Sequence, residues 1–446
     1  MALGVGVGVL LLLGACSSPA VGVPLFLPPG CTPAHSAPPG WADRLLGAYA
    51  DEHDAYAARL RALPPVLARA IGLNATLLAV GRAAHANTAA LWTLLGAAGA
   101  AAEPVRALGA AARSSSCCGA ADRSGDAYAS ASAVLAHLSR DWAEGSSAAR
   151  ASAALVRLLA RYVRSPAHAA RARVLVPGAG ACGLAVALAA AGYTVEANDS
   201  SLLMLRAAQG LLALGRAGAP CSAPLALWPA ALADANVRAR AAQLRPVRVS
   251  ACHGARGRRT RRALGRLSLQ LGSFADAALY ATAAADEPAR APPDATAAPL
   301  RPRGRGGWDG VVTSFVLDAL PMPPHRVVAA VAALLRPGGA WLFAGPLAYH
   351  EASVPPLAMD ELVALLPNFN FTVRSRRVLR VSAYVPAERP RGARAGWRAL
   401  VAGACAVAGV VGPLLPMACA TSASLARVGY EAEAFVATRD ALVGGE

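Results

Sequence analysis

The spacing of apolar residues and glycines predicts a strand–turn–helix–strand unit near the middle of the chain. Apolar residues fill 174–176, glycines punctuate 178–183, and small or apolar residues continue over 184–191. A second predicted strand covers 194–197 and ends in Asn198-Asp199. A short apolar run bounded by glycine is typical of a strand that is buried on both faces, and the longer run fits a helix. This order is the first half of a nucleotide-binding α/β unit.

A second region, 308–349, repeats this alternation of strand and helix. Asp309 precedes an apolar run over 311–317, and a helical pattern over 326–335 leads through Arg-Pro-Gly-Gly into an apolar run over 340–344. A helix that stops at the sequence LRPGG before an apolar strand is usual in S-adenosylmethionine-dependent methyltransferases and rare in dehydrogenases. The two regions together predict an α/β class I methyltransferase (Rossmann-like) fold. Its seven-stranded sheet should be mostly parallel, with an antiparallel last strand and helices on both faces.

Helical spacing of apolar residues dominates the N-terminal part of the chain. It covers 41–63, where Pro64-Pro65 should end the helix, and it returns over 129–162. We therefore predict a helical N-terminal domain over 35–165 and a methyltransferase domain over 166–446.

Three segments of the second domain have the composition of insertions, at 252–266, 284–306 and 385–425. The first is a run of Arg and Gly, and the second is rich in Ala, Pro and Arg, so both are predicted to be loops. An apolar run over 397–422 is long enough to span a bilayer. Its prolines and many small residues favour an insertion or a docked helix instead.

The glycines at 178, 180 and 183 carry the first candidate chemistry. Glycine lets the backbone turn tightly and approach a ligand, and the free N–H groups of the following helix point to the same place. Asp199, at the tip of the next strand, can hold both hydroxyls of a ribose. The spacing G-x-G-x-x-G also fits a dinucleotide site, so the spacing alone does not decide between the two cofactor classes.

A series of motifs resembles the carnosine N-methyltransferase family over residues 130–385, and weakly over the last twenty. In order they are RDW-x-EG, VPGAG, Gly-Tyr, Asn-Asp-Ser, GSF, WD-x-x-x-T-x-F-x-x-D, LRPGG-x-W and GPL-x-YH. The first, at 140–145, and the last, which ends at His350, are the specific ones. The resemblance implies S-adenosylmethionine as the cofactor and a small histidine-containing dipeptide as the substrate.

The resemblance also implies which residues bind the cofactor. Arg140 would pair with the methionine carboxylate, and His137 stands where the family has Gln. Ser273 and Phe274 match an Asp-Phe pair that contacts the adenine, and Ser273 lacks that carboxylate. Ser314 replaces a Cys. The alternative for Arg140-Asp141-Trp142 is a helix-packing motif with a local ion pair. The predicted cofactor-binding residues are His137, Arg140, Gly178, Gly180, Gly183, Asp199, Ser273, Phe274 and Ser314.

The acceptor side is also implied by the resemblance. An imidazole is a nucleophile only when it is neutral. Asp318 would hold one ring N–H and so fix the tautomer, while the alternative is a helix cap before Pro321. His350 would contact the substrate, whereas its neighbour Tyr349 is predicted to be a core residue. Tyr384 and Tyr430 would line the substrate pocket, so the predicted catalytic pair is Asp318 and His350, and both also bind substrate.

Composition changes this picture little. The formal charge is +17, and all 43 basic residues are Arg. They are dispersed apart from the clusters at 256–266 and 301–305, and no aromatic residues alternate with them, so we expect no nucleic-acid partner. The 9 cysteines show no C-x-x-C or Cys/His ligand spacing, so we expect no metal.

The first residues of the chain raise a question of location. Residues 1–30 form an apolar leader that predicts a signal or a membrane anchor, although it lacks a basic beginning. A real leader implies a secretory or membrane-anchored protein with membrane contact, whereas the family resemblance implies a cytoplasmic enzyme. Both interpretations stay open, and the pattern predicts no oligomeric state.

The function predicted from these residues is methylation of the imidazole of carnosine, or of a related dipeptide, to give anserine. The first alternative is a methyltransferase that acts on another small-molecule or peptide histidine. The second is a degenerate methyltransferase fold that serves as a membrane-tethered binding module. It is motivated by Ser273, the Gly and Ala bias and the leader.

Overall fold

The computed structural model describes most of the chain from Trp41 onward. The described residues are 41–99, 106–107, 130–143, 146–163, 172–215, 224–233, 239–251, 254–272, 274, 307–320, 322–347, 349, 356–381 and 430–440. The leader and the segments 284–306, 385–425 and 397–422 lie outside these residues. The predictions for them stay predictions.

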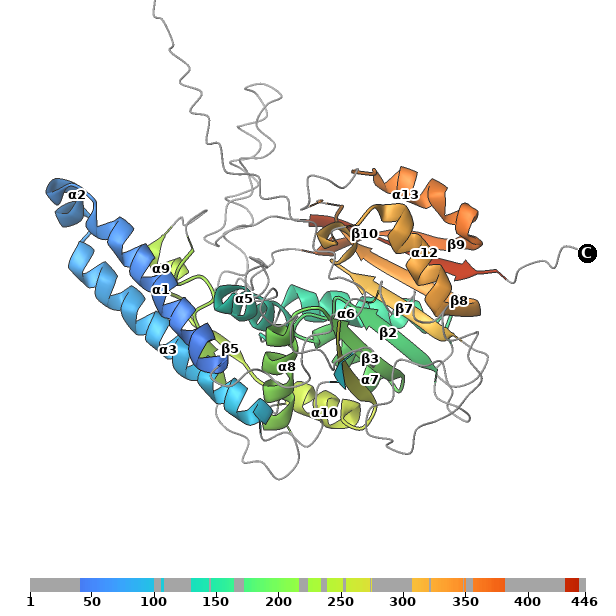
Figure 1. Ribbon diagram of the computed structural model, residues 1–446, viewed down its shortest axis with the longest axis horizontal. Helices are drawn as coiled ribbons and strands as arrows, with labels where there is room; N and C mark the ends of the chain where they lie inside the picture. The colour runs from blue at the N-terminus through green and yellow to red at the C-terminus, as the bar shows by residue number, and fades with distance from the viewer. Residues whose placement is uncertain are drawn as a thin grey trace, which may run out of the picture.

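The centre of the molecule is an eight-stranded sheet with the order β1-β6-β3-β2-β7-β8-β10-β9 (Figure 1). β10 runs antiparallel to both of its neighbours, and the pairs among the other strands are parallel. Seven strands confirm the predicted class I methyltransferase sheet, and the eighth is a two-residue edge strand, β1. The strands of this sheet are β1 (Arg106–Ala107), β2 (Arg173–Pro177), β3 (Thr194–Asp199), β6 (Leu267–Leu271), β7 (Trp308–Ser314), β8 (Leu335–Gly345), β9 (Phe371–Val381) and β10 (Tyr430–Arg439), and β4 (Leu225–Leu227) and β5 (Val247–Val249) form a separate antiparallel pair.

The order of the strands creates one switch point. The chain passes from β2 outward through β3 to β6, and then crosses back to β7 and outward to β8. β2 and β7 are neighbours, so the loops that follow them leave the sheet side by side at its carboxyl edge. In open α/β sheets, ligands bind in the crevice at such a point.

The sheet separates two apolar clusters because successive side chains of a strand point to opposite faces. Val174 and Val176 of β2 belong to one cluster, which also takes in the N-terminal helices. Leu175 belongs to the other cluster, with Trp341 and Phe343 of β8. In this second cluster the indole of Trp341 packs edge-on against Phe343 and donates to the Thr313 hydroxyl at 2.9 Å.

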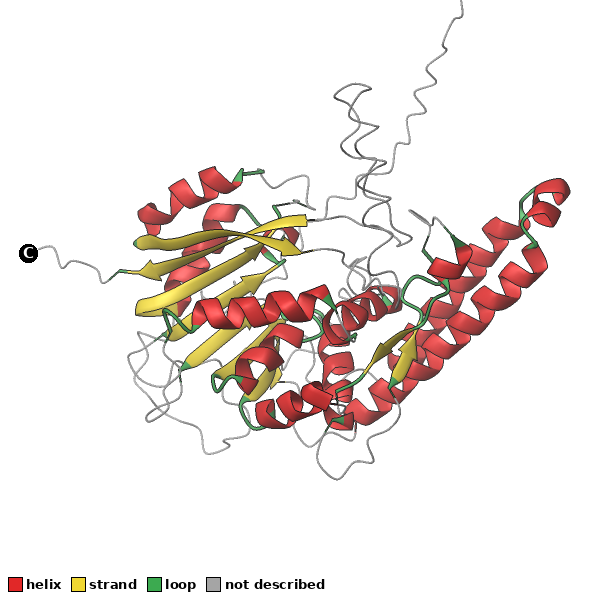
Figure 2. Cartoon of the chain, turned by 180° about the vertical axis from the view of Figure 1, so that it is seen from behind, coloured by secondary structure: helices red, strands yellow, loops and turns green. Residues whose placement is uncertain are grey.

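Helices cover both faces, as predicted (Figure 2). The second cluster is covered by the helices that follow β7 and β8, and the first by those of the N-terminal part and by those that follow β2 and β3. The helices are α1 (Trp41–Arg61), α2 (Pro65–Ala70), α3 (Leu73–Gly99), α5 (Ala131–Trp142), α6 (Ser147–Leu159), α7 (Gly183–Ala190), α8 (Leu202–Leu214), α9 (Arg240–Gln243), α10 (Gly254–Ala263), α12 (Pro324–Leu334) and α13 (Met359–Leu365), with short 3₁₀ turns η1 (Leu317–Ala319) and η2 (Leu366–Phe369).

The N-terminal helices pack directly on the sheet domain. α1 and α3 lie side by side as a hairpin in both views (Figures 1 and 2). α3 crosses α8 so closely that a Cβ on Gly210 would lie 1.9 Å from the carbonyl oxygen of Leu94. Only glycine fits at this crossing. Among the described residues, none of the helices combines the length and apolar character that a bilayer-spanning helix requires.

The single helical stretch predicted over 129–162 is two helices, α5 and α6. Ser146 begins the second one, because its hydroxyl accepts the N–H of Ala149 at 3.0 Å. The same hydroxyl donates to the carbonyl of Arg140 at 2.6 Å, which ties the start of α6 to the end of α5. Ser is a preferred N-cap residue, and this polar interruption outweighs the continuous apolar spacing.

The Arg-rich segment predicted as a loop at 252–266 contains a helix, α10. Gly257, Thr260 and Ala263 are buried, whereas Arg258 and Arg261 are exposed. Small buried residues at every third position form one helical face, and this face is too weakly apolar for a hydrophobicity pattern to detect. The expectation of a loop there was wrong.

Two strand boundaries also differ from the prediction. β7 ends at Ser314 instead of 317, because Phe315 turns the chain with a positive φ of 57°. The LRPGG sequence does not precede its strand but lies within β8, where Gly338 has a φ of 75° and the pairing with β7 shifts register after Trp308.

Candidate functional site

The loop after β2 lies at the switch point of the sheet and follows a left-handed path that glycine adopts readily. Gly178 and Gly180 have φ values of 59° and 52°, which favour glycine. A Cβ on Gly178 would lie 2.2 Å from Cγ2 of Val316, in the loop after β7. The two loops that leave the carboxyl edge therefore touch each other, and no larger residue fits between them.

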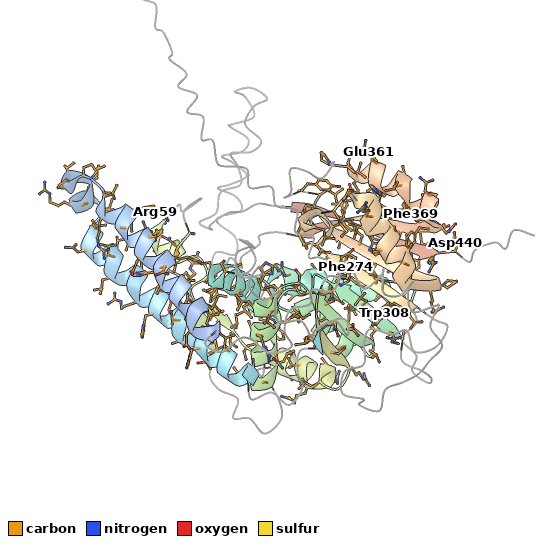
Figure 3. All side chains as sticks on the ribbon, in the orientation of Figure 1. Arg59, Phe274, Trp308, Glu361, Phe369 and Asp440 are labelled. Carbon is orange, nitrogen blue, oxygen red and sulfur yellow. The ribbon has the colours of Figure 1, made fainter. Side chains whose placement is uncertain are left out.

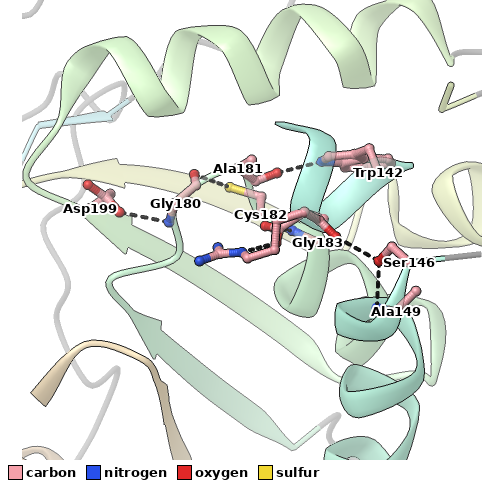
Figure 4. A network of polar contacts seen from close by, with 10 residues as sticks. Trp142, Ser146, Ala149, Gly180, Ala181, Cys182, Gly183 and Asp199 are labelled. Atoms are coloured by element: carbon pink, nitrogen blue, oxygen red, sulfur yellow. Dashed lines mark hydrogen bonds and ion pairs between the residues drawn. The ribbon is translucent and has the colours of Figure 1, made fainter. Parts of the chain in front are cut away.

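Asp199 supports this loop from the end of β3. One carboxylate oxygen accepts the N–H of Gly180 at 2.7 Å (Figure 4). The other accepts the N–H of Ser201 at 2.8 Å. A carboxylate has about four acceptor positions, so these two bonds do not exhaust its capacity. Asp199 is partly exposed, which leaves it within reach of a ligand at the crevice.

Helix α5 lies over the same loop. The indole of Trp142 donates to the carbonyl of Ala181 at 2.7 Å (Figure 4). A Cβ on Gly180 would lie 3.0 Å from Nδ1 of His137 and 3.4 Å from Nη2 of Arg140. The structure thus brings together Gly178, Gly180, Asp199, His137 and Arg140, which the sequence places far apart.

The RDW motif makes the local ion pair and the packing contact that its alternative interpretation predicts, and the proposed contact of Arg140 with the cofactor stays a prediction. Nε of Arg140 donates to Asp141 at 2.6 Å, which is the local ion pair. The carboxylate of Asp141 also accepts the N–H of Gly183, the first residue of α7, at 3.3 Å. The motif is therefore a packing element whose partner is the glycine loop.

Cys182 precedes α7 and adopts a left-handed conformation with a φ of 63°. Its thiol is fully buried and lies 3.7 Å from the carbonyl oxygen of Gly180. Burial raises the pKa of this thiol well above its usual value, with smaller contributions from Asp199 and Asp141. A buried neutral thiol is unreactive, so Cys182 has a structural role.

His137 is held in the neutral form. Its Nδ1 atom is enclosed, although the ring is partly exposed. The pKa of His137 is lowered to about 3, chiefly by burial and also by the nearby charge of Arg140, while the charge of Asp141 opposes the shift. A neutral ring has one donor and one acceptor, so it can contact a ligand without adding charge.

The depressed pKa of His137 predicts a loss of stability in acid. Between pH 6.5 and about 3 the unfolded chain binds a proton at this residue and the folded chain does not, so acid favours unfolding. We expect His137 to have no effect on the pH dependence of the free energy of unfolding above pH 6.5, and to lower that free energy by up to about 2 kcal/mol at pH 5. In His137→Gln, the decrease in the free energy of unfolding between pH 7.5 and pH 5 should be smaller by that amount, as measured by urea titrations at each pH. An unchanged dependence in the variant would show that His137 titrates normally.

Asp318 lies in η1 and is connected to the glycine loop through Val316. It is only 4% exposed, and Val316, two residues earlier, packs against Gly178. Phe315 begins the turn with a positive φ, which is a strained conformation for a bulky residue, and its N–H is held by the carbonyl of Ala344 at 2.9 Å. The strained turn directs the chain from β7 into η1.

Tyr349 follows β8 and lies close enough to Asp318 for the two side chains to interact electrostatically. Its hydroxyl donates to the carbonyl of Leu357 at 3.2 Å, and its ring packs on the second apolar cluster. Burial raises the pKa of Tyr349, the bond to Leu357 opposes this, and the charge of Asp318 adds to the rise. The ring packs as predicted for a core residue, but the hydroxyl also lies within the electrostatic reach of Asp318.

The structure describes only some of the other predicted site residues. Phe274 is 2% exposed and belongs to the second cluster (Figure 3). Ser314 ends β7 and is partly exposed. Ser273, His350 and Tyr384 lie outside the described residues, and Tyr430 is placed only as the first residue of β10. Their roles stay predictions.

Two residues with clear roles at the loop were missed as site residues, Asp141 and Trp142. Both belong to a motif that the sequence singled out, so a signal was present. The sequence could not show that their partners are Gly183 and Ala181, about forty positions further along the chain. Within the part of the chain that the structure describes, no cluster of three or more His, Cys, Asp or Glu residues could hold a metal ion.

Comparison with known proteins gives one family match and several weak structural likenesses. The model of a family described as Carnosine N-methyltransferase matches residues 121–389, which is more than half of the chain. None of the curated proteins matches.

Solved structures resemble the chain only weakly. One is magnesium protoporphyrin IX methyltransferase from Synechocystis PCC 6803 with bound S-adenosylmethionine, with a TM-score of 0.31 and 12% identity over 66% of this chain and 80% of that chain. Another is a TehB-like S-adenosylmethionine-dependent methyltransferase from Corynebacterium glutamicum, with a TM-score of 0.29 and 9% identity over 65% of this chain and 87% of that chain. These likenesses are too weak to place any residue of the site.

Proposed function

The chain belongs to the carnosine N-methyltransferase family, and from this premise we propose that it transfers a methyl group to an imidazole nitrogen of carnosine or of a related histidine-containing dipeptide. With carnosine the product is anserine. The family uses S-adenosylmethionine, and the chain is a methyltransferase that depends on this cofactor.

The residues at the crevice fit this cofactor. His137 and Arg140 of helix α5 both reach the loop at Gly180, where a Cβ would lie 3.0 Å from Nδ1 of His137 and 3.4 Å from Nη2 of Arg140. Asp199 offers a carboxylate for ribose hydroxyls, and Arg140 offers a guanidinium for a carboxylate. Asp141 accepts at the N-terminus of α7, where a dinucleotide site would hold a pyrophosphate. This negative charge favours a phosphate-free cofactor.

The observation that carries the proposal is the contact between Gly178 and Val316. It joins the loop assigned to the methyl donor to the turn that presents Asp318, the residue assigned to the acceptor. Methyl transfer requires the donor and the nucleophile to be held in line at close range, and this contact supports a site in which the two proposed halves are neighbours.

The cofactor, when bound, supplies a methyl group on a sulfonium, so the protein need not provide the reactive group. We infer that Asp318 accepts the N–H of one imidazole nitrogen. This bond fixes the tautomer and leaves the lone pair of the other nitrogen directed at the donor. The ring gains positive charge as it is methylated, and the carboxylate of Asp318 stabilises that charge until the N–H proton that it holds is released to solvent, which leaves the neutral product. Arg140 and Asp199 hold the donor, and His350 and Tyr384 are proposed contacts of the dipeptide.

Calorimetry tests the donor half of this proposal. We expect the protein to bind S-adenosylmethionine and not NAD, because the glycine loop is followed by the methyltransferase strand order and its helix N-terminus is already occupied by Asp141. Equal or tighter binding of NAD would contradict the assignment.

A methyl-transfer assay tests the acceptor half. Carnosine, free histidine and a histidine-containing peptide are compared as acceptors, and we expect carnosine to have the highest kcat/KM. Turnover with one of the other histidine compounds but not with carnosine would support methyltransferase activity and contradict carnosine as the substrate. Cofactor binding with no turnover on any acceptor would favour a binding module.

A further inference from the structure

Asp141 joins the two elements that form the donor half of the site. One carboxylate oxygen accepts from Nε of Arg140 at 2.6 Å, and the other accepts from the N–H of Gly183 at 3.3 Å. The side chain of Asp141 is 9% exposed and that of Arg140 is 18% exposed, so both groups are largely withdrawn from solvent. A charge-assisted bond in such a place is stronger and less screened than one at the surface.

The first consequence concerns α7. Cys182, its N-cap residue, makes no side-chain cap bond. Asp141 supplies the missing acceptor from another helix, and a negative charge at this end of α7 also interacts favourably with the helix dipole. The fit is close, because a Cβ on Gly183 would lie 2.7 Å from Cβ of Asp141. The glycine loop is thereby held at both ends, by Asp199 at Gly180 and by Asp141 at Gly183.

The second consequence concerns Arg140. A guanidinium has five N–H donors in a rigid plane, and Asp141 takes the one at Nε. This fixes the plane and leaves the far edge directed at the loop, where Nη2 lies 3.4 Å from the Cβ position of Gly180. An arginine that is oriented before the ligand arrives loses less freedom on binding than a mobile one.

We propose that Asp141 is the positioning residue of the donor site, acting through Arg140 on the carboxylate of the methyl donor. Asp141 does not touch the donor itself. It determines where the guanidinium points, and so how tightly the amino-acid end of the donor is bound. This inference rests on the proposed function, because it requires a donor that carries a carboxylate.

The test compares two ligands that differ in that carboxylate. S-adenosylhomocysteine keeps the amino-acid end, whereas 5′-methylthioadenosine has the adenosine and the sulfur without it. Binding of each is measured by calorimetry on the full chain and on Asp141→Asn. The amide is isosteric and can still accept the Gly183 N–H, but it removes the ion pair with Arg140. We expect Asp141→Asn to weaken S-adenosylhomocysteine by about tenfold or more, and 5′-methylthioadenosine by less than about threefold.

Asp309 provides a matched control. Its carboxylate also accepts one backbone N–H, from Arg173 at 2.7 Å, and one arginine Nε, from Arg336 at 2.6 Å. This pair of bonds lies at the amino ends of β2 and β7, on the edge of the sheet opposite the crevice. Asp309→Asn should lower the melting temperature and leave both dissociation constants unchanged.

A double-mutant cycle isolates the route through Arg140. If Asp141 acts through the guanidinium, Asp141→Asn should have little further effect on S-adenosylhomocysteine once Arg140 is replaced by Ala. Equal weakening of both ligands, additive effects in the cycle, or no weakening at all would each overturn the inference. If the wild-type chain bound 5′-methylthioadenosine but not S-adenosylhomocysteine, the inference alone would fail. Binding of neither would overturn the proposed function as well.

Discussion

Replacing Asp318 by Asn is expected to lower the rate of methyl transfer by about 10²–10⁴ while cofactor affinity stays nearly unchanged. Asp318 is 4% exposed and stands at the end of a strained turn, so its position is strongly constrained. An amide can present its N–H₂ group to the ring, which selects the wrong tautomer, and it stabilises the imidazolium poorly. The measurement is steady-state turnover on carnosine beside a calorimetric titration with S-adenosylhomocysteine.

The pH dependence adds a second readout to the same experiment. The substrate imidazole has an unperturbed pKa of about 6.5, so kcat/KM should fall as the pH drops below that value and the nucleophile is protonated. This limb belongs to the substrate and should persist in the variant at a lower rate. Full turnover by Asp318→Asn would leave Asp318 with a structural role in η1. A variant that has lost cofactor binding would show that the substitution disturbs the contact between Val316 and Gly178 instead.

Replacing Asp199 by Ala is expected to weaken cofactor binding by at least about tenfold, roughly 1.4 kcal/mol. The sequence alone suggested the loss of a charge-assisted bond to a ribose hydroxyl. The structure adds that the substitution would also remove the carboxylate that accepts the N–H groups of Gly180 and Ser201. The loop at the donor site should therefore loosen as well, which adds to the loss of the direct contact.

Calorimetry with S-adenosylhomocysteine measures this change, and Asp309→Ala serves as the control for the loss of an acidic side chain that holds a backbone N–H elsewhere in the sheet. The control should keep its affinity. Wild-type affinity in Asp199→Ala would show that Asp199 neither binds the ribose nor organises the loop.

Much of the sheet could be predicted because its strands carry local signals. β2 contains a short apolar run, β3 begins just after the Gly-Tyr turn and ends in Asn198-Asp199, and each was predicted to within two residues of its ends. Helix α10 and the break between α5 and α6 escaped prediction. A face of Gly, Thr and Ala among arginines has little hydrophobic contrast, and the cap at Ser146 depends on one hydroxyl.

The candidate site divides in a similar way. Gly178, Gly180 and Asp199 were recognisable because a tight turn and an acidic strand end recur at fixed spacing, and the structure places them together. The role of Asp141 was not recognisable, because its partner Gly183 lies 42 positions away and nothing local indicates the contact.

The sequence by itself determined the class of fold, the strand that leads into the glycine loop and the motifs that mark the family. These depend on apolar periodicity and on the conformations open to glycine, which act over a few residues. Only the tertiary structure decided that helix α5 covers the loop, that Val316 closes against Gly178, and that Asp141 joins Arg140 to the start of α7. Those contacts arise when β2 and β7 become neighbours and the N-terminal helices pack on the sheet, so they depend on long-range packing that no short stretch of sequence encodes.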